Sequence, residues 1–120
     1  MESITEINLI KELRKKFPNF VEENPIEEFC GNYDYIGHFS FVLEEELDKT
    51  GEKNHSFIEK AFEFFNKMAE EGNDEVQNIL IVEVLESLAD EGTRTKVARE
   101  KLKGKALEYF ERVLRGWDKD

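Results

Sequence analysis

Helical periodicity is the feature that most restricts what this chain can fold into. Apolar residues recur three or four positions apart in one stretch after another, which places them along one face of an α-helix. No stretch shows the sustained alternation of polar and apolar residues that a half-buried strand requires. The sequence therefore predicts an all-α fold. We expect a compact bundle of five to six helices, antiparallel because their connections are short, with a middle helix pair similar to those of helical-repeat proteins.

Capping residues and helix breakers set the expected helix bounds. Three helix starts carry capping signals: the capping boxes Ser3 with Glu6 and Ser56 with Glu59, and the N-cap residue Asn73. Pro18 ends the first helix, because the residue before a proline is driven out of the helical region. Residues 19–32 are expected to form an irregular connector with at most a short helical turn. The expected helices cover residues 4–16, 34–49, 56–72, 73–89, 95–102 and 106–116.

Length and cysteine content indicate a single domain in a reducing compartment. A chain of 120 residues fits one helical domain, residues 1–120, with one core. Cys30 is the only cysteine, so no disulfide can form within the chain, and a cytoplasmic location fits best. The first residues lack the basic start and apolar run of a signal peptide. No segment approaches the roughly 20 apolar residues that span a bilayer.

Charge is sorted along the sequence. Residues 17–48 carry nine acidic side chains and no Lys or Arg, and residues 68–93 carry eight more without a cation. Residues 94–105 instead hold six cations against one glutamate, which we expect to pair with acidic segments of this chain or of a dimer. With a net charge of −11, the chain should repel nucleic acid and anionic membranes and attract a basic protein. When free, the protein is expected to be a monomer or a weak homodimer.

Residues that could carry chemistry are few. His38 and His55 lack other ligands at the spacings of a zinc motif, and we expect His38 to be a partly buried imidazole bonded to a neighbour. Glu27, Glu28 and Asp34 near Cys30 argue against a reactive thiolate. There is no phosphate-binding loop or nucleophile elbow. The sequence therefore predicts a protein without enzymatic activity, cofactor or metal.

The acidic residues of the first half are the strongest candidates for a binding surface. Glu44 and Asp48 stand four positions apart on one expected helix, a like-charge spacing that destabilises an isolated helix by roughly a few tenths of a kcal/mol. A solvated acidic face is an equally good explanation of this pattern. The predicted binding residues are Glu22, Glu23, Glu27, Glu28, Tyr33, Asp34, Tyr35, Glu44, Glu45, Glu46 and Asp48.

Polar residues on the fourth helix allow two interpretations. Gln77 and Asn78 lie among apolar positions, where an unmet amide costs about 1 to 3 kcal/mol. They are expected to bond to the backbone of an adjacent loop and fix the helix register, and contact with a partner is the alternative. Glu83 and Glu86 are expected to be ordinary solvated residues.

Three stretches resemble a known family. FEFFNKMAEEGNDEVQNILIVEVLESLADEG (residues 62–92), KLKGKALEYFERVL (101–114) and LIKELRKKFPNF (9–20) are similar to short all-helical bacterial immunity proteins of polymorphic-toxin and contact-dependent growth inhibition systems. The resemblance implies a cytoplasmic antidote that binds a cognate toxin domain, often a nuclease, and blocks its active site. An acidic protein would suit the basic surface of such a toxin.

Three functional hypotheses follow from the sequence. The first is an immunity protein that occludes the basic surface of a toxin. The second is a helical adaptor that holds a peptide between helices with Phe39, Phe41 or Phe57. The third is a small hydrolase built on carboxylates, which requires a cleft where carboxylates converge.

Overall fold

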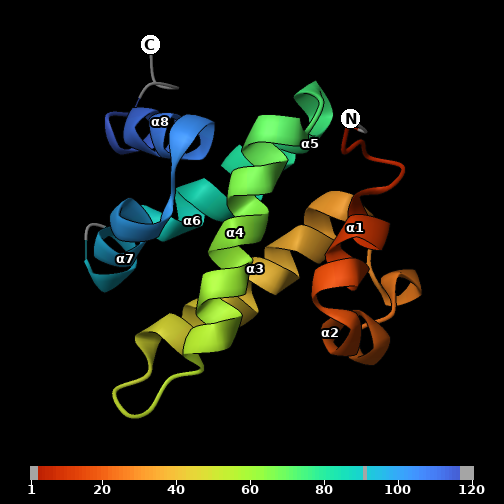
Figure 1. Cartoon of the computed structure of the whole chain (residues 1–120), viewed down its shortest axis with the longest axis horizontal. Coiled ribbons are helices and arrows are strands. Elements are labelled where there is room, and N and C mark those ends of the chain that lie inside the picture. Colours follow the sequence, from red (N-terminus) through yellow and green to blue (C-terminus); the bar gives the residue numbers. More distant parts are fainter. Residues whose placement is uncertain (1–2, 91, 117–120) are drawn as a thin grey trace.

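The described part of the chain is helical throughout, apart from turns and short connections. The computed structural model describes residues 3–90 and 92–116. Figure 1 shows its elements: α1 (Leu9–Lys16), α2 (Pro18–Glu23), η1 (Ile26–Glu28), α3 (Asn32–Asp48), α4 (His55–Glu71), α5 (Asp74–Ile79), η2 (Leu80–Leu85), α6 (Glu86–Leu88), α7 (Thr93–Lys101) and α8 (Gly104–Leu114). The residues joining α5, η2 and α6 keep helical dihedral angles, so these elements form one continuous helix. The expected all-α fold is confirmed.

The two longest helices, α3 and α4, occupy the middle of the molecule. Each has 17 residues, and α4 returns along α3 after the loop at residues 49–54. Figure 1 shows α1 and α2 on one side of this pair and α7 and α8 on the other. The helix α5–η2–α6 then runs parallel to α3, since Asn78 donates to Tyr33 near one end and Ser87 donates to Glu44 near the other.

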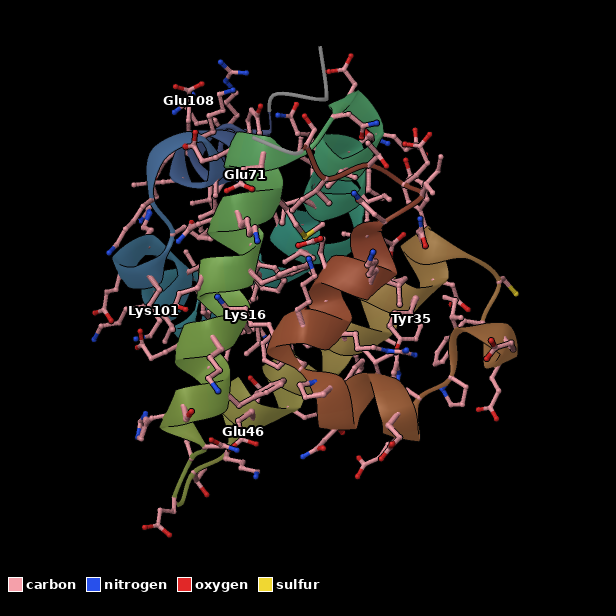
Figure 2. All side chains as sticks on the ribbon, turned by 45° about the vertical axis from the view of Figure 1, so that its right-hand side comes forward. Lys16, Tyr35, Glu46, Glu71, Lys101 and Glu108 are labelled. Atoms are coloured by element: carbon pink, nitrogen blue, oxygen red, sulfur yellow. The ribbon has the colours of Figure 1, made fainter. Side chains whose placement is uncertain are left out.

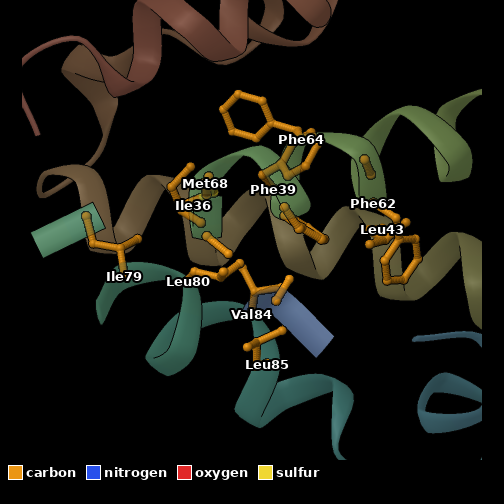
Figure 3. Packing of buried hydrophobic residues seen from close by; sticks show 14 of the residues in the cluster. Ile36, Phe39, Leu43, Phe62, Phe64, Met68, Ile79, Leu80, Val84 and Leu85 are labelled. Carbon is orange, nitrogen blue, oxygen red and sulfur yellow. The ribbon is translucent and has the colours of Figure 1, made fainter. Parts of the chain in front are cut away.

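The hydrophobic core lies where α3, α4 and η2 meet. Figure 3 shows Phe39 and Leu43 of α3 with Phe62 of α4 and with Leu80 and Val84 of η2, and all five side chains are buried. Burying a side chain of this size contributes about 1.5 to 3 kcal/mol, which makes these stripes the main source of stability. The helix α5–η2–α6 is therefore a central, buried element of the fold.

The first helix begins later than expected, and the Ser3 capping box is absent. Residues 4–8 form an extended residue and a turn instead. Ile4 makes a parallel bridge beside Gly72, with Ile4 N–H donating to Glu71 O at 2.9 Å and Asn73 N–H donating to Ile4 O at 2.9 Å. Burial of the Ile4 side chain in the core favours this contact over a further helical turn. Ile7 lies in the turn that follows Ile4 and is 91% exposed.

Residues 19–32 are more regular than expected, because α2 covers their first part. Pro18 ends α1, as predicted, but it also starts α2 at the first helical position, where its missing N–H costs no hydrogen bond. The short turn expected near Ile26 is present as η1. With α2 included, the described residues form seven helices, against the five to six expected, when α5, η2 and α6 are taken as one.

The later helix starts agree with the sequence in part. Asn73 caps α5 by accepting the Val76 N–H at 3.0 Å, as predicted. Asn54, and not Ser56, caps α4, because its side chain accepts the Phe57 N–H at 3.1 Å. The six residues of η2 are wound as a π-helix, which the apolar pattern did not predict.

Within the described ranges, no helix combines the length and the apolar character needed to cross a bilayer.

Candidate protein-binding surface

The predicted binding residues do not form one surface, because α3 separates them. Asp34 and Asp48 are 14 positions apart on this helix, which corresponds to about 21 Å at 1.5 Å per residue. Figure 2 shows Tyr35 near α1 and α2, whereas Glu46 lies toward the opposite end of α3. One group is therefore Glu22, Glu23, Glu27, Glu28, Tyr33, Asp34 and Tyr35, and the other is Glu44, Glu45, Glu46 and Asp48.

The second group is largely neutralised by the protein's own cations. Arg94 donates two hydrogen bonds to Asp48, from Nε to Oδ1 at 3.2 Å and from Nη2 to Oδ2 at 2.8 Å. This hydrogen-bonded guanidinium lowers the pKa of Asp48. Glu44 is only 6% exposed. It accepts hydrogen bonds from Ser40 and Ser87 and lies 3.5 Å from Arg94 Nη1. Glu44 therefore belongs to the interior of the protein, and the prediction that it contacts a partner is wrong.

Glu46 is also used within the chain. It accepts the Asn54 N–H at 2.6 Å and pairs with Lys49 Nζ at 2.9 Å. These two contacts, the backbone N–H first, lower the pKa of Glu46. Glu45 is exposed and forms no ion pair with any described residue. The end of α3 thus does not present the coherent negative surface that the sequence predicted.

The basic block of residues 94–105 supplies several of these internal partners. Besides the contacts of Arg94, Arg99 pairs with Glu111 at 3.0 Å and Lys101 pairs with Glu59. The expectation that this block pairs with acidic groups of the same chain is confirmed for these three cations.

Tyr35, predicted as an exposed anchor, is fully buried. Its hydroxyl donates to Asn24 O at 2.7 Å, and burial raises the pKa of the phenol. Tyr33 is half-buried, and its hydroxyl accepts a hydrogen bond from Asn78 Nδ2 at 2.8 Å. Tyr35 therefore fastens α3 to the preceding connection and cannot contact a partner.

The connection that carries the remaining carboxylates is held against α3 by an aromatic and amide cluster. Asn24 Oδ1 lies 3.2 Å from Nε2 of His38, and Asn24 Nδ2 donates to Phe20 O at 2.9 Å. The His38 ring packs between Phe20 and Phe29, with centroid distances of 5.9 and 5.3 Å. The partly buried, bonded His38 expected from the sequence is confirmed, and it fixes residues 20–29 in place.

The acidic residues of α2 and η1 form a surface that we call the α2–η1 acidic surface. It consists of Glu22, Glu23, Glu27 and Glu28, all of them exposed. None forms an ion pair with a residue that the structure describes. Nearby, Asp34 accepts the Cys30 N–H at 3.0 Å and is exposed to solvent. The acidic surface expected from the sequence therefore persists, reduced to this end of the molecule.

Glu83, expected to be an ordinary solvated residue, is instead partly buried beside α3. Its Oε1 lies 2.5 Å from the point that a Cβ on Gly37 would occupy, so only a glycine leaves this space to the carboxylate. Partial burial, followed by the charges of Asp34 and Glu86, raises the pKa of Glu83. A glycine in the middle of an expected helix, where it costs roughly 1 kcal/mol relative to alanine, was the available signal.

Gln77 and Asn78 each find a partner. Gln77 Nε2 donates to the backbone oxygen of Ala69 at 2.9 Å, so the expected backbone bond is present, but its acceptor lies in the last turn of α4 and not in a loop. Asn78 bonds to the Tyr33 hydroxyl instead of a loop backbone.

The described cavities differ in their carboxylates, and a small one of about 160 Å³ is lined by three, Glu59, Glu63 and Glu100. A cavity of about 580 Å³ is lined by residues of α7 with Leu114, and it includes one carboxylate, Glu100. A second, of about 540 Å³, lies between α2 and the start of α4 and includes one carboxylate, Glu23. Among the residues described, no group of three His, Cys, Asp or Glu side chains could hold a metal ion.

Comparisons with known proteins give one match. A protein-family model for a domain of unknown function matches residues 10–118, which is most of the chain. No curated protein and no solved structure matches the chain significantly.

Proposed function

The chain belongs to the family described as Domain of unknown function (DUF7674), and from its surface we propose that it is a non-catalytic antidote that binds a cationic toxin domain. The observation that carries the proposal is the α2–η1 acidic surface, whose four glutamates remain exposed and unpaired among the described residues. At the end of α3, by contrast, Arg94 neutralises Asp48.

Electrostatics gives this surface a physical role. A cluster of like charges raises the local potential, attracts a partner of opposite sign and speeds its association. A nuclease toxin binds a polyanion through a basic site, so an acidic protein seated there excludes the substrate without any chemical step. The resemblance to bacterial immunity proteins supports the same role in the cytoplasm, with a toxin as the partner and no nucleic acid or membrane bound.

The α2–η1 acidic surface is already ordered in the free protein, which supports this proposal. The Asn24, His38 and Tyr35 contacts hold the connection between α2 and α3 in one conformation before any partner arrives. A surface that is already ordered loses less conformational entropy on binding. We therefore expect tight, one-to-one binding with a salt-sensitive association rate.

Growth rescue tests this function. The chain is co-expressed with the product of the neighbouring gene, and growth is compared with and without it. We expect the neighbour to be toxic alone and harmless with the antidote. The variant Glu27→Gln/Glu28→Gln should slow association severalfold at low salt, whereas the control Glu52→Gln/Glu100→Gln, which removes the same charge elsewhere, should not. A harmless neighbour, or a complex that does not survive low salt, contradicts the proposal.

A helical adaptor is the second candidate, and one observation favours it. Phe17, Phe20 and Phe57 line the cavity of about 540 Å³ beside α2, which could receive apolar side chains of a peptide. Phe39, which the adaptor hypothesis also invoked, is buried and does not line that cavity. Modest affinity for a peptide in this cavity, with no toxic neighbour, would favour the adaptor.

A further inference from the structure

Phe41 is the one phenylalanine of the chain that stays in solvent. Nine of the ten phenylalanines lie in the core or pack against it, but Phe41 is 54% exposed in the middle of α3. Val82, on the neighbouring η2, is 41% exposed. A single exposed apolar residue is unremarkable. Here, however, two of the three large exposed apolar residues of the described chain belong to adjacent, parallel helices.

Carboxylates share the helix sides that carry these two apolar residues. Asp34, Phe41 and Glu45 stand seven and four positions apart, so they share one side of α3, and Val82 and Glu86 share one side of η2 and the start of α6. Glu83 lies between the two helices against Gly37. We call this surface the α3–η2 face; it comprises Asp34, Phe41, Glu45, Val82, Glu83 and Glu86.

The carboxylates of this face have no counter-ion in the part of the chain that the structure describes. None of the four forms an ion pair with a described Lys or Arg. Partial burial, and after it the charges of Asp34 and Glu86, raises the pKa of Glu83. A cation placed here would therefore relieve repulsion that the free protein retains.

The two helices are fixed together at both ends of the face. Asn78 Nδ2 donates to the Tyr33 hydroxyl at 2.8 Å before the face begins. Glu44 binds Ser87 and approaches Arg94 after it ends. Figure 3 shows Ile36 and Leu43 of α3 beside Leu80 and Val84 of η2, which close the space beneath. The face is thus rigid, and binding to it requires little ordering of the protein.

We propose that the α3–η2 face is a docking site for a basic, amphipathic segment of a protein partner. An apolar side chain of the segment packs on Phe41 and Val82, and its Lys or Arg side chains meet Asp34, Glu83 and Glu86. The proposal rests on the proposed function for the existence of a cationic partner, and it adds a second, partly apolar contact surface distinct from the α2–η1 acidic surface. Charge complementarity selects this occupant, and the two apolar residues supply the anchor that charge alone lacks.

A peptide titration tests the site separately from the antidote function. The probe is a synthetic Leu/Lys peptide long enough for about four helical turns, and a Leu/Glu peptide of the same length is its control. Amide chemical shifts of the full chain are followed by NMR. We expect the largest shifts at residues 34–45 and 82–86. Phe41→Ala should weaken binding about tenfold, the size of a typical anchor residue, while Glu27→Gln/Glu28→Gln should weaken it much less.

Several results would overturn the proposal. They are shifts centred on the α2–η1 acidic surface, equal affinity of Phe41→Ala and the unmodified chain, equal binding of the Leu/Glu peptide, or self-association of the protein through this face in sedimentation. Circular dichroism of Phe41→Ala confirms that the fold is intact, which is expected because the side chain is exposed. If the chain rescues growth but does not bind the peptide, only the proposed docking site on the α3–η2 face is refuted. If it binds the peptide but the neighbouring gene product is not toxic, only the antidote function is refuted.

Discussion

Replacing Arg94 with methionine should destabilise the protein, because Arg94 is the only described cation beside the buried Glu44. Methionine keeps much of the aliphatic length of the side chain but removes the guanidinium. The change also frees Asp48 and Asp90, which lie 2.8 and 3.8 Å from Arg94. Glu44 keeps only its two serine partners and would remain a charge with little access to water.

The structure sets the size of this effect. Breaking a fully buried ion pair costs about 3 to 5 kcal/mol, and an exposed pair contributes about 0 to 1 kcal/mol. The Arg94 side chain is 27% exposed, so solvent screens part of its interaction with Glu44. We therefore expect a loss of about 2 kcal/mol in the free energy of unfolding. With an unfolding entropy of about 2.1 cal/mol/K per residue, this loss lowers Tm by about 8 °C.

Urea unfolding followed by circular dichroism measures the change. Arg99→Met is the matched control, because Arg99 pairs with Glu111 while its own side chain is 54% exposed. That variant should lose less than about 1 kcal/mol. In the double variant Arg94→Met/Glu44→Gln, part of the loss should be recovered, since the buried charge is gone. If Arg94→Met loses no more unfolding free energy than Arg99→Met, the contact between Arg94 and Glu44 does not stabilise the fold. The end of α3 would then again be a candidate interface.

Three further predictions concern the remaining local features. Gly37→Ala should raise the unfolding free energy by up to about 1 kcal/mol through helix propensity, since the added methyl displaces only the flexible end of the Glu83 side chain. The displaced Glu83 should weaken Leu/Lys peptide binding, and normal binding by this variant contradicts the role of Glu83. Asn54→Ala should lower the unfolding free energy by about 1 kcal/mol through the lost helix cap, whereas Ser56→Ala should change the urea midpoint little. A larger loss for Ser56→Ala than for Asn54→Ala would indicate that Ser56 caps α4. The lowered pKa of Asp48 contributes stability above its unfolded pKa of about 3.9, and this stability is lost as pH falls through the folded pKa. Between neutral and acidic pH, the unfolding free energy of Arg94→Met should therefore drop less than that of the unmodified chain, and an equal drop would argue against this linkage.

Much of the fold could be predicted from the sequence because helix signals are local. Apolar residues at helical spacing predicted buried helix faces, which Phe39, Leu43 and Leu47 form on α3, and Asn73 predicted the start of α5. Predictions failed where a distant residue competed with a local signal. Ser3 stands three residues before Glu6, but Ile4 is instead held in a bridge beside Gly72, which lies 68 positions later.

The candidate surface was predicted less well, for a related reason. A run of glutamates shows that charge is present, yet it does not show which carboxylates remain free. Asp48 is paired with Arg94, 46 positions away, while Glu27 and Glu28 keep no described partner. Glu83 became notable only because Gly37 of α3 lies against it.

The sequence by itself determined the all-helical architecture, the buried faces and the sign of the surface charge. Each depends on residues within a turn or two of one another, or on composition. Only the tertiary structure decided which negative charges are neutralised inside the protein and which remain available to a partner. That outcome depends on the parallel alignment of α3 with α5–η2–α6, which is set by the packing of side chains far apart in the sequence.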